Sequence, residues 1–300
     1  MSEGDDNSFK GAVEDWNYFS RQSLRLRRKR GMLPGSSGMP TVPFLSFSIL
    51  VGILGILCLG LTVYWSQHWL GGFAWDGSHK MFNWHPALMV AGMLVLYGTA
   101  ALVYRLPFSQ TGPKFPWKVL HATLTLVAFV LVVLGLEAVF EFHSVQKIPN
   151  MYSLHSWLGL SAVLLFSCQP QIQCRYHKVR LPIHVSPFQW LMGFASFLMP
   201  WTPIWFRALY KPIHVFFGST ILALAIASCI SGINEKLFFR LKNSTTPYSK
   251  LPAEAWLANI LGMLIVVFGV LVLLGLAIPG WKCPDVNSQD MREPLLQEAR

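Results

Sequence analysis

Five long apolar runs limit what this chain can fold into. A helix needs about 20 apolar residues to cross a membrane, and runs of this length lie at roughly 43–66, 84–104, 119–142, 212–233 and 256–278. Only 13% of the 300 residues are charged, whereas soluble domains carry about a quarter. We therefore expect an all-α, polytopic membrane protein.

A sixth apolar region, 152–206, is interrupted. Its halves flank residues 170–189, PQIQCRYHKVRLPIHVSPFQ, which contain prolines, histidines and charged residues. Proline breaks the helical hydrogen-bond ladder, and lipid offers the backbone no replacement partners. We interpret the region as one helix carrying an insertion at 170–189, which gives a six-helix bundle; two marginal helices would instead give seven.

Charge distribution predicts the topology. The segment RLRRKR precedes the first run, so the positive-inside rule places the N-terminus in the cytosol. This segment explains much of the net charge of +10, and no nucleic-acid-binding module is recognisable. We expect a disordered basic cytosolic tail at 1–42, a transmembrane domain at 43–281 and a cytosolic tail at 282–300.

The loop 234–252 is expected on the luminal side, although it carries several basic residues. Its Asn243-Ser244-Thr245 sequence is a glycosylation sequon, which is useful only there. The five cysteines form no CxxC or CxxCH motif. A disulfide framework, a zinc site and covalently attached haem are therefore unsupported.

Four histidines stand at the starts of four apolar runs, namely His85, His121, His155 and His214. Consecutive helices run in opposite directions, so His85 and His155 should lie near the luminal face and His121 and His214 near the cytosolic face. Haem iron takes two axial nitrogens from opposite sides, which suits each pair. Proton-relaying histidines in a channel or transporter are the alternative.

The groups around the two faces differ. Lys118 and Lys211 each precede a histidine in the pattern K-x-x-H, and so share its helix face. With Arg105 and Arg207 they would form a cationic collar suited to an anionic reductant or to haem propionates. The luminal face offers oxygen and imidazole ligands that suit a metal ion as acceptor, from Asp76, His79, Glu141, His143 and Glu235.

Several stretches carry a family resemblance: FNWHPALMV, LVYR, KVLHATL, FHS, NMYSLHSWLGL, KPIHVFFG and SGINEKLFF. In order and position they resemble the cytochrome b561 family of transmembrane ascorbate-dependent oxidoreductases. The resemblance covers roughly 43–281 except 170–189. It is strongest to the members of lysosomal or late-endosomal membranes that are considered ferric reductases, and the leucine pair near the C-terminus gives weak support for that location.

The resemblance implies two non-covalent haem b groups, one held by His85 and His155 and the other by His121 and His214. Arg105, Glu235 and the stretch Asn150, Met151, Tyr152 and Ser153 would contact haem. Lys118 and Arg207, with Lys211, would bind cytosolic ascorbate, and His143 would take part in substrate reduction. The luminal acceptor would be ferric iron or monodehydroascorbate. Membrane lipid surrounds such proteins, and a homodimer is a candidate assembly.

The insertion departs from the family, in which the equivalents of Gln169 and Trp190 are adjacent. Its basic residues at bilayer depth would cost roughly 2.5–3.5 kcal/mol each. We expect impaired folding or haem loading relative to a form without 170–189. A haem-free, inactive splice variant is therefore an alternative to an active reductase.

Overall fold

The computed structural model describes residues 41–110, 113, 115–168, 204–242 and 244–278. All of them belong to one compact unit that begins at Thr41. These residues form helices and no strands, which confirms the all-α fold predicted from the sequence. The two expected tails and the insertion at 170–189 lie outside the described residues, except that the first helix begins at Thr41.

The described helical elements follow each other in one order along the chain. It runs α2 (Thr41–His68), α3 (His79–Phe82), α4 (Trp84–Met89), the π-helix η1 (Val90–Leu96), α5 (Tyr97–Leu102), the 3-10 turn η2 (Val103–Arg105), α6 (Pro107–Gln110), α7 (Phe115–Gln146), α8 (Leu154–Cys168), α10 (Ile204–Leu241), the 3-10 turn η4 (Tyr248–Lys250) and α11 (Ala253–Ala277).

Five of the described segments are long and apolar enough to cross a membrane, and they coincide with the five predicted runs. The segment 79–105 combines α3, α4, η1, α5 and η2, whereas α8 is shorter, with 15 residues. Helix α10 exceeds its predicted run of 212–233 at both ends. Its last turns contain Glu235, Lys236 and Leu237, which are good helix formers, so the helix continues beyond the apolar residues.

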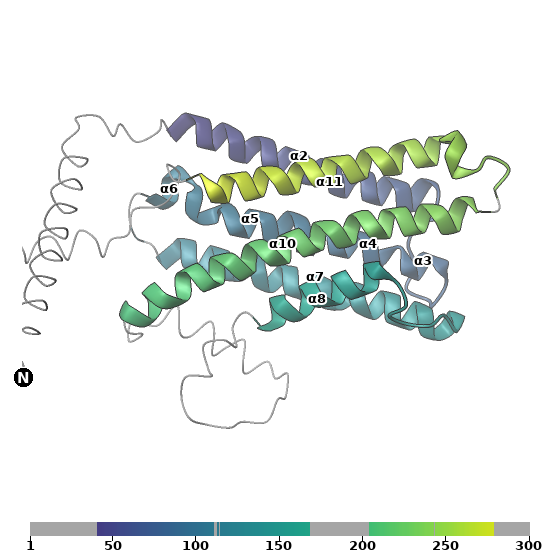
Figure 1. Ribbon diagram of the computed structural model, residues 1–300, viewed down its shortest axis with the longest axis horizontal. Helices are drawn as coiled ribbons and strands as arrows, with labels where there is room; N and C mark the ends of the chain where they lie inside the picture. The colour runs from purple at the N-terminus through teal and green to yellow at the C-terminus, as the bar shows by residue number, and fades with distance from the viewer. Residues whose placement is uncertain (1–40, 111–112, 114, 169–203, 243, 279–300) are drawn as a thin grey trace, which may run out of the picture. The chain divides into compact units, whose positions relative to one another are not determined.

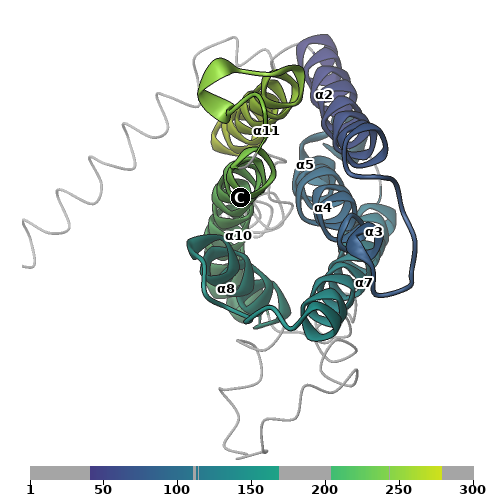
Figure 2. The same ribbon diagram turned by 90° about the vertical axis from the view of Figure 1, so that its right-hand side faces the viewer.

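Two helix pairs face each other across the bundle, and α2 and α11 lie to one side of them (Figures 1 and 2). The segment from α4 to α5 packs against α7, and α8 packs against α10. Helices α2 and α11 pack against each other, and α11 also contacts α10. Fully buried small residues such as Ala100, Ala128 and Ala138 let the helices approach closely.

The outer surface of the bundle is apolar. Ile53 and Ile56 on α2 are 60% and 70% exposed, and Phe216 on α10 and Met263 on α11 are exposed to similar degrees. Soluble proteins rarely expose large contiguous apolar patches. An apolar exterior on helices of this length is the surface that lipid covers, and it leaves the histidines to the interior.

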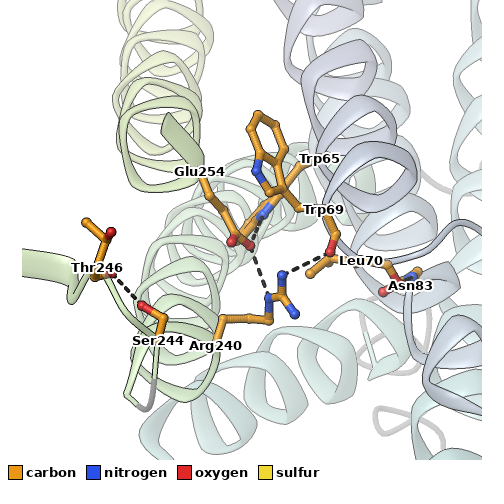
Figure 3. Close-up of polar contacts among 8 residues, drawn as sticks. All are labelled: Trp65, Trp69, Leu70, Asn83, Arg240, Ser244, Thr246 and Glu254. Atoms are coloured by element: carbon orange, nitrogen blue, oxygen red, sulfur yellow. Dashed lines mark hydrogen bonds and ion pairs between the residues drawn. The ribbon is translucent and has the colours of Figure 1, made fainter. Parts of the chain in front are cut away.

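One end of the bundle is held by a buried carboxylate (Figure 3). Glu254, in the first turn of α11, accepts a hydrogen bond of 3.0 Å from Trp65 Nε1 of α2. Its Oε1 also lies 3.4 Å from Nε of Arg240 on α10, and Arg240 donates a second bond to the carbonyl of Trp69. This cluster ties α2 to α10 and α11, which are distant from it in the sequence.

Candidate bis-histidine sites

The four histidines form two facing pairs inside the bundle. The ring centroids of His85 and His155 are 5.9 Å apart, and those of His121 and His214 are 6.1 Å apart. In each pair one ring comes from the α4/α7 helix pair and the other from the α8/α10 helix pair. The pairing expected from alternating helix direction is therefore confirmed.

Backbone carbonyls orient three of these rings. Nδ1 of His85 lies 3.0 Å from the carbonyl oxygen of Gly135, and Nδ1 of His121 lies 2.8 Å from that of Ala100. Nδ1 of His155 lies 2.8 Å from the carbonyl oxygen of Ser228. A carbonyl oxygen only accepts hydrogen bonds, so Nδ1 carries the proton in each ring and Nε2 keeps its lone pair.

Helix periodicity explains why the carbonyls fall at these places. Gly135 follows His121 on α7 by the same interval as Ser228 follows His214 on α10. At about 3.6 residues per turn, this interval is roughly four full turns and returns to the same helix face. The interval from His85 to Ala100 is slightly longer, and the wider π-helix η1 between them accommodates the extra residue.

The two facing histidine pairs have a geometry that fits haem. Two metal–imidazole bonds of about 2 Å, added to the ring radii, put two centroids roughly 6 Å apart, which matches both observed separations. Ligating histidines commonly donate their second N–H to a backbone carbonyl, which fixes the ring and raises its basicity. His85, His121 and His155 do this, so the donor set has the chemistry that a bis-imidazole group requires.

The surroundings of His155 are crowded. A Cβ added at Gly232 would lie 2.7 Å from the His155 ring, closer than real contacts allow. The Ser228 hydroxyl also contacts the ring, at 3.1 Å from Nδ1. Glycine at position 232 therefore lets the α10 backbone pass directly beside the imidazole.

The loop between α7 and α8 holds the residues of the NMYS stretch in place. Asn150 Oδ1 accepts a hydrogen bond of 2.9 Å from Nδ1 of His143. Met151 has a positive φ of 59°, and its carbonyl accepts a bond from Trp157 Nε1. The Ser153 hydroxyl accepts from the amide of Ser156 in the first turn of α8. This loop connects the His143 side chain to the helix that carries His155.

Tyr152 completes the loop by contacting α10. Partial burial raises the pKa of its phenol, and the Glu235 carboxylate, to which the phenol is hydrogen-bonded, raises it further. Tyr152, Glu235, His143 and Asn150 thus lie at one end of the bundle. We call this end, where α7 meets α8 and α10 leaves the span, the α7–α8 end.

The other acidic and imidazole groups of that end do not gather into a metal site. Asp76, His79 and Glu141 are exposed, and hydrogen bonds from Ser78 hold the pKa of the Asp76 carboxyl below its usual value. Within the described ranges, no cluster of three or more His, Cys, Asp and Glu side chains could hold a metal ion. The sequence predicted a set of metal ligands on the luminal face, and the described residues form no such cluster there.

Of the four basic residues expected around His121 and His214, Arg105 has a clear structural role. Its buried guanidinium donates hydrogen bonds to the carbonyls of Leu276 and Ile278, where α11 ends. Lys118 is half-buried and Lys211 is exposed, each one turn before its histidine. Arg207 lies in α10, and its side chain is outside the described residues.

The sequence interpretation missed the carbonyl acceptors of Ala100, Gly135 and Ser228. A search for residues a whole number of helical turns beyond each histidine would have identified two of them. It also missed Lys236, whose ammonium group lies 4.0 Å from the centroid of the Phe82 ring at the α7–α8 end. The adjacent Glu235 was recognised, but Lys236 was counted only as a loop charge.

Known proteins similar to this chain support the same picture. A family model described as eukaryotic cytochrome b561 matches residues 84–173 and 181–240. The human lysosomal membrane ascorbate-dependent ferrireductase is 56% identical over 250 residues, which cover 83% of this chain and 95% of the human protein. Its zebrafish (Danio rerio) counterpart is 52% identical over 79% of this chain and 90% of its own length.

A relative with a different location also matches. The plasma membrane ascorbate-dependent reductase of Xenopus laevis is 39% identical over 253 residues, which cover 84% of this chain and 81% of that protein. Helical spans and facing histidines thus occur in a chain similar over most of its length to named reductases of two membranes.

Proposed function

The chain belongs to the cytochrome b561 family, and from this premise we propose that it transfers electrons across the lysosomal membrane, from cytosolic ascorbate to ferric iron on the luminal side. It is an oxidoreductase, and two haem b groups would be its cofactors. His85 and His155 would hold the luminal haem, and His121 and His214 the cytosolic one. Monodehydroascorbate is the other acceptor we consider.

The observation that carries this proposal is the geometry of the two imidazole pairs. Each pair has a ring separation suited to an intervening iron, and three of the four rings have Nδ1 bound to a carbonyl, so that Nε2 remains for the metal. A group that relays protons by exchanging both ring protons has no need of rings fixed in this way. When bound, haem supplies reversible one-electron exchange at each level of the membrane.

The depth of the two sites follows from the helices themselves. His121 and Gly135 stand about four turns apart on α7, which corresponds to about 21 Å of helix rise. One site would therefore lie near each end of the span, with the two pairs carried by the same two helix pairs. Apolar side chains between the levels, such as Val132 and Leu222, are fully buried and exclude water.

On the cytosolic side, Lys118 and Lys211 stand one turn before the ligand histidines. With Arg207 they would hold the ascorbate anion near the His121–His214 pair by charge-assisted hydrogen bonds. Arg105 donates hydrogen bonds to the carbonyls at the end of α11. These cations would raise the local concentration of an anionic donor and orient it.

On the luminal side, His143 would take part in delivery of the electron to the acceptor. Its Nδ1 is bound to Asn150, so Nε2 faces elsewhere with its lone pair available as an iron ligand or proton acceptor. The NMYS loop fixes this side chain relative to His155, and Glu235 and Tyr152 lie on the same side of the bundle.

The purified full-length chain in proteoliposomes tests the proposal. With ascorbate enclosed on the side of Lys118, we expect sharp reduced-haem bands in a reduced-minus-oxidised spectrum, two haems per chain, and reduction of ferric citrate outside. A chain that stays colourless after haem supplementation, while its form without 170–189 is also colourless, would contradict the proposal. Haem binding only by the shorter form would identify this chain as the inactive variant.

A further inference from the structure

The cation of Lys236 lies near the His85–His155 pair, with the Phe82 ring between it and His85. Ser228, Gly232 and Lys236 follow each other at i, i+4 spacing along α10, so they share one helix face. The Ser228 carbonyl accepts the hydrogen bond from His155 Nδ1, and Gly232 lies against the His155 ring. Lys236 is therefore the next side chain on that face, one turn closer to the α7–α8 end.

The ammonium group of Lys236 reaches across the bundle. It lies 4.0 Å from the centroid of Phe82 on α3, and the Phe82 ring lies 6.1 Å from His85. Phe82 is also packed against Phe142 of α7, with ring centroids 5.4 Å apart. The lysine thus spans from the α8/α10 helix pair to the α4/α7 helix pair at the outer edge of the imidazole pair.

The nearby acids are committed to other partners. Glu254, whose charge is felt by Lys236, is bound to Arg240 and Trp65 (Figure 3). Glu235 is bound to Tyr152. Arg240 adds a second positive charge, and among the residues described no ion pair to Lys236 occurs. A half-buried ammonium group that rests against an aromatic face is well placed to receive an anion.

We propose that Lys236 binds a carboxylate at the luminal mouth of the His85–His155 site. Two sources have this chemistry: a propionate of the haem held there, and an organic-acid chelate of ferric iron arriving from the lumen. The inference rests on the proposed function for the identity of the site. It differs from the sequence expectation that this face suits a cation, because the structure adds a lysine where only acids and imidazoles had been considered.

The test compares Lys236→Gln, Lys236→Arg and the control Lys80→Gln, which removes an exposed lysine from α3 at the same end. Three quantities are measured on the purified full chain: the midpoint potential of each haem, the KM for ferric citrate and for a cationic ammine complex, and citrate binding by equilibrium dialysis. Loss of a charge-assisted contact should change a binding constant on the order of tenfold.

A propionate partner predicts that Lys236→Gln lowers the potential of the luminal haem, because a cation stabilises the reduced state, with no change in the KM ratio. A substrate partner predicts a higher KM for ferric citrate and weaker citrate binding, with unchanged potential and unchanged KM for the ammine complex. Lys236→Arg keeps the positive charge, so it should retain most of the wild-type haem potential in the first case and most of the wild-type citrate binding in the second.

The inference is overturned if Lys236→Gln matches Lys80→Gln in all three measurements, or if Lys236→Arg behaves like Lys236→Gln in all of them. Its failure is separable from that of the proposed function. Dialysis needs no haem, so a haem-free chain that binds citrate through Lys236 would support the inference and contradict the function. A haem-free chain that binds no citrate would contradict both.

Discussion

The His85–His155 and His121–His214 pairs have nearly the same ring separation but stand at different places relative to the ends of α8 and α10. Both histidines of the luminal pair donate to described carbonyls, at Gly135 and Ser228. In the cytosolic pair the described acceptor is Ala100, which binds His121. His214 also has a partner, so the described bonds do not rank the two pairs.

The difference in position predicts which pair is more sensitive to the chain between α8 and α10. In the pair formed by α4–α5 and α7, each side donates an imidazole hydrogen bond to a backbone carbonyl of the other: His85 to Gly135, and His121 to Ala100. Between α8 and α10, the described bond of this kind runs from His155 to the carbonyl of Ser228. His214 lies near the start of α10, whereas His155 lies at the far end of α8, so we expect perturbations of the chain between these helices to affect the His121–His214 site first.

Removing one ligand from each pair should have the largest effect. We expect His155→Ala and His121→Ala each to lose about one of the two haems, because a bis-imidazole site retains little affinity with one ligand. Haem-to-protein stoichiometry and the separate band positions of the remaining haem report which site is lost. Two variants with identical residual spectra would show that the pairs are not independent sites.

Deletion of 170–189, which joins Gln169 to Trp190, tests the asymmetry itself. It removes basic residues that would be costly at bilayer depth, and gives the chain before α10 the length that the family resemblance implies. We expect higher haem occupancy at the His121–His214 site and little change at the His85–His155 site. Haem stoichiometry measured in the His155→Ala and His121→Ala backgrounds separates the two, and equal occupancy with and without the insertion would refute the expectation.

A smaller effect is expected at the luminal pair from Gly232→Ala. The added methyl group would press on the His155 ring and tilt it from its carbonyl; changes of this kind around a ligand typically cost about 10–100-fold in metal affinity. Gly262→Ala is the matched control, because its Cβ would meet only Ile233, at 4.0 Å. Haem titration into the apo forms gives both affinities, and equal values would argue against the close contact.

The smallest effect should come from Glu254→Gln. The change weakens the contact with Arg240, whose side chain is 43% exposed, while the Trp65 bond can remain. We expect a loss of about 1–2 kcal/mol in the free energy of unfolding, with faster loss of the luminal than of the cytosolic haem on heating. Spectra recorded along a thermal melt measure the order in which the two haems are lost. Simultaneous loss would mean that the Glu254 cluster stabilises the whole bundle uniformly.

Much of the arrangement could be predicted because lipid imposes simple rules. Run length gave the five spans, and alternating direction gave both histidine pairs. Most of the polar contacts could not be predicted, because they depend on helix phase across the bundle; the carbonyls of Gly135 and Ser228, about four turns beyond a histidine, are exceptions. Arg105 shows this: its position after the second span indicated a site charge, whereas the folded chain also uses its guanidinium to bind the carbonyls at the end of α11.

The ends of α10 show the complementary limit. Hydropathy marks where a helix leaves lipid but not where it stops, so α10 runs on to Leu241 and carries Lys236 on the His155 face. The luminal acids were taken from composition as a group, and the fold separates them. Glu235 faces Tyr152, while Asp76 and Glu141 are exposed.

The acceptors that hold the imidazoles are main-chain atoms, and this has an evolutionary consequence. No point substitution can delete a carbonyl oxygen, so exchanges of Ala100 or Ser228 for residues of similar size should leave ring orientation intact. Insertions and deletions within a span are different, because a shift of one residue turns every following carbonyl by about 100°. Selection at these sites should therefore act more strongly on helix length than on residue type.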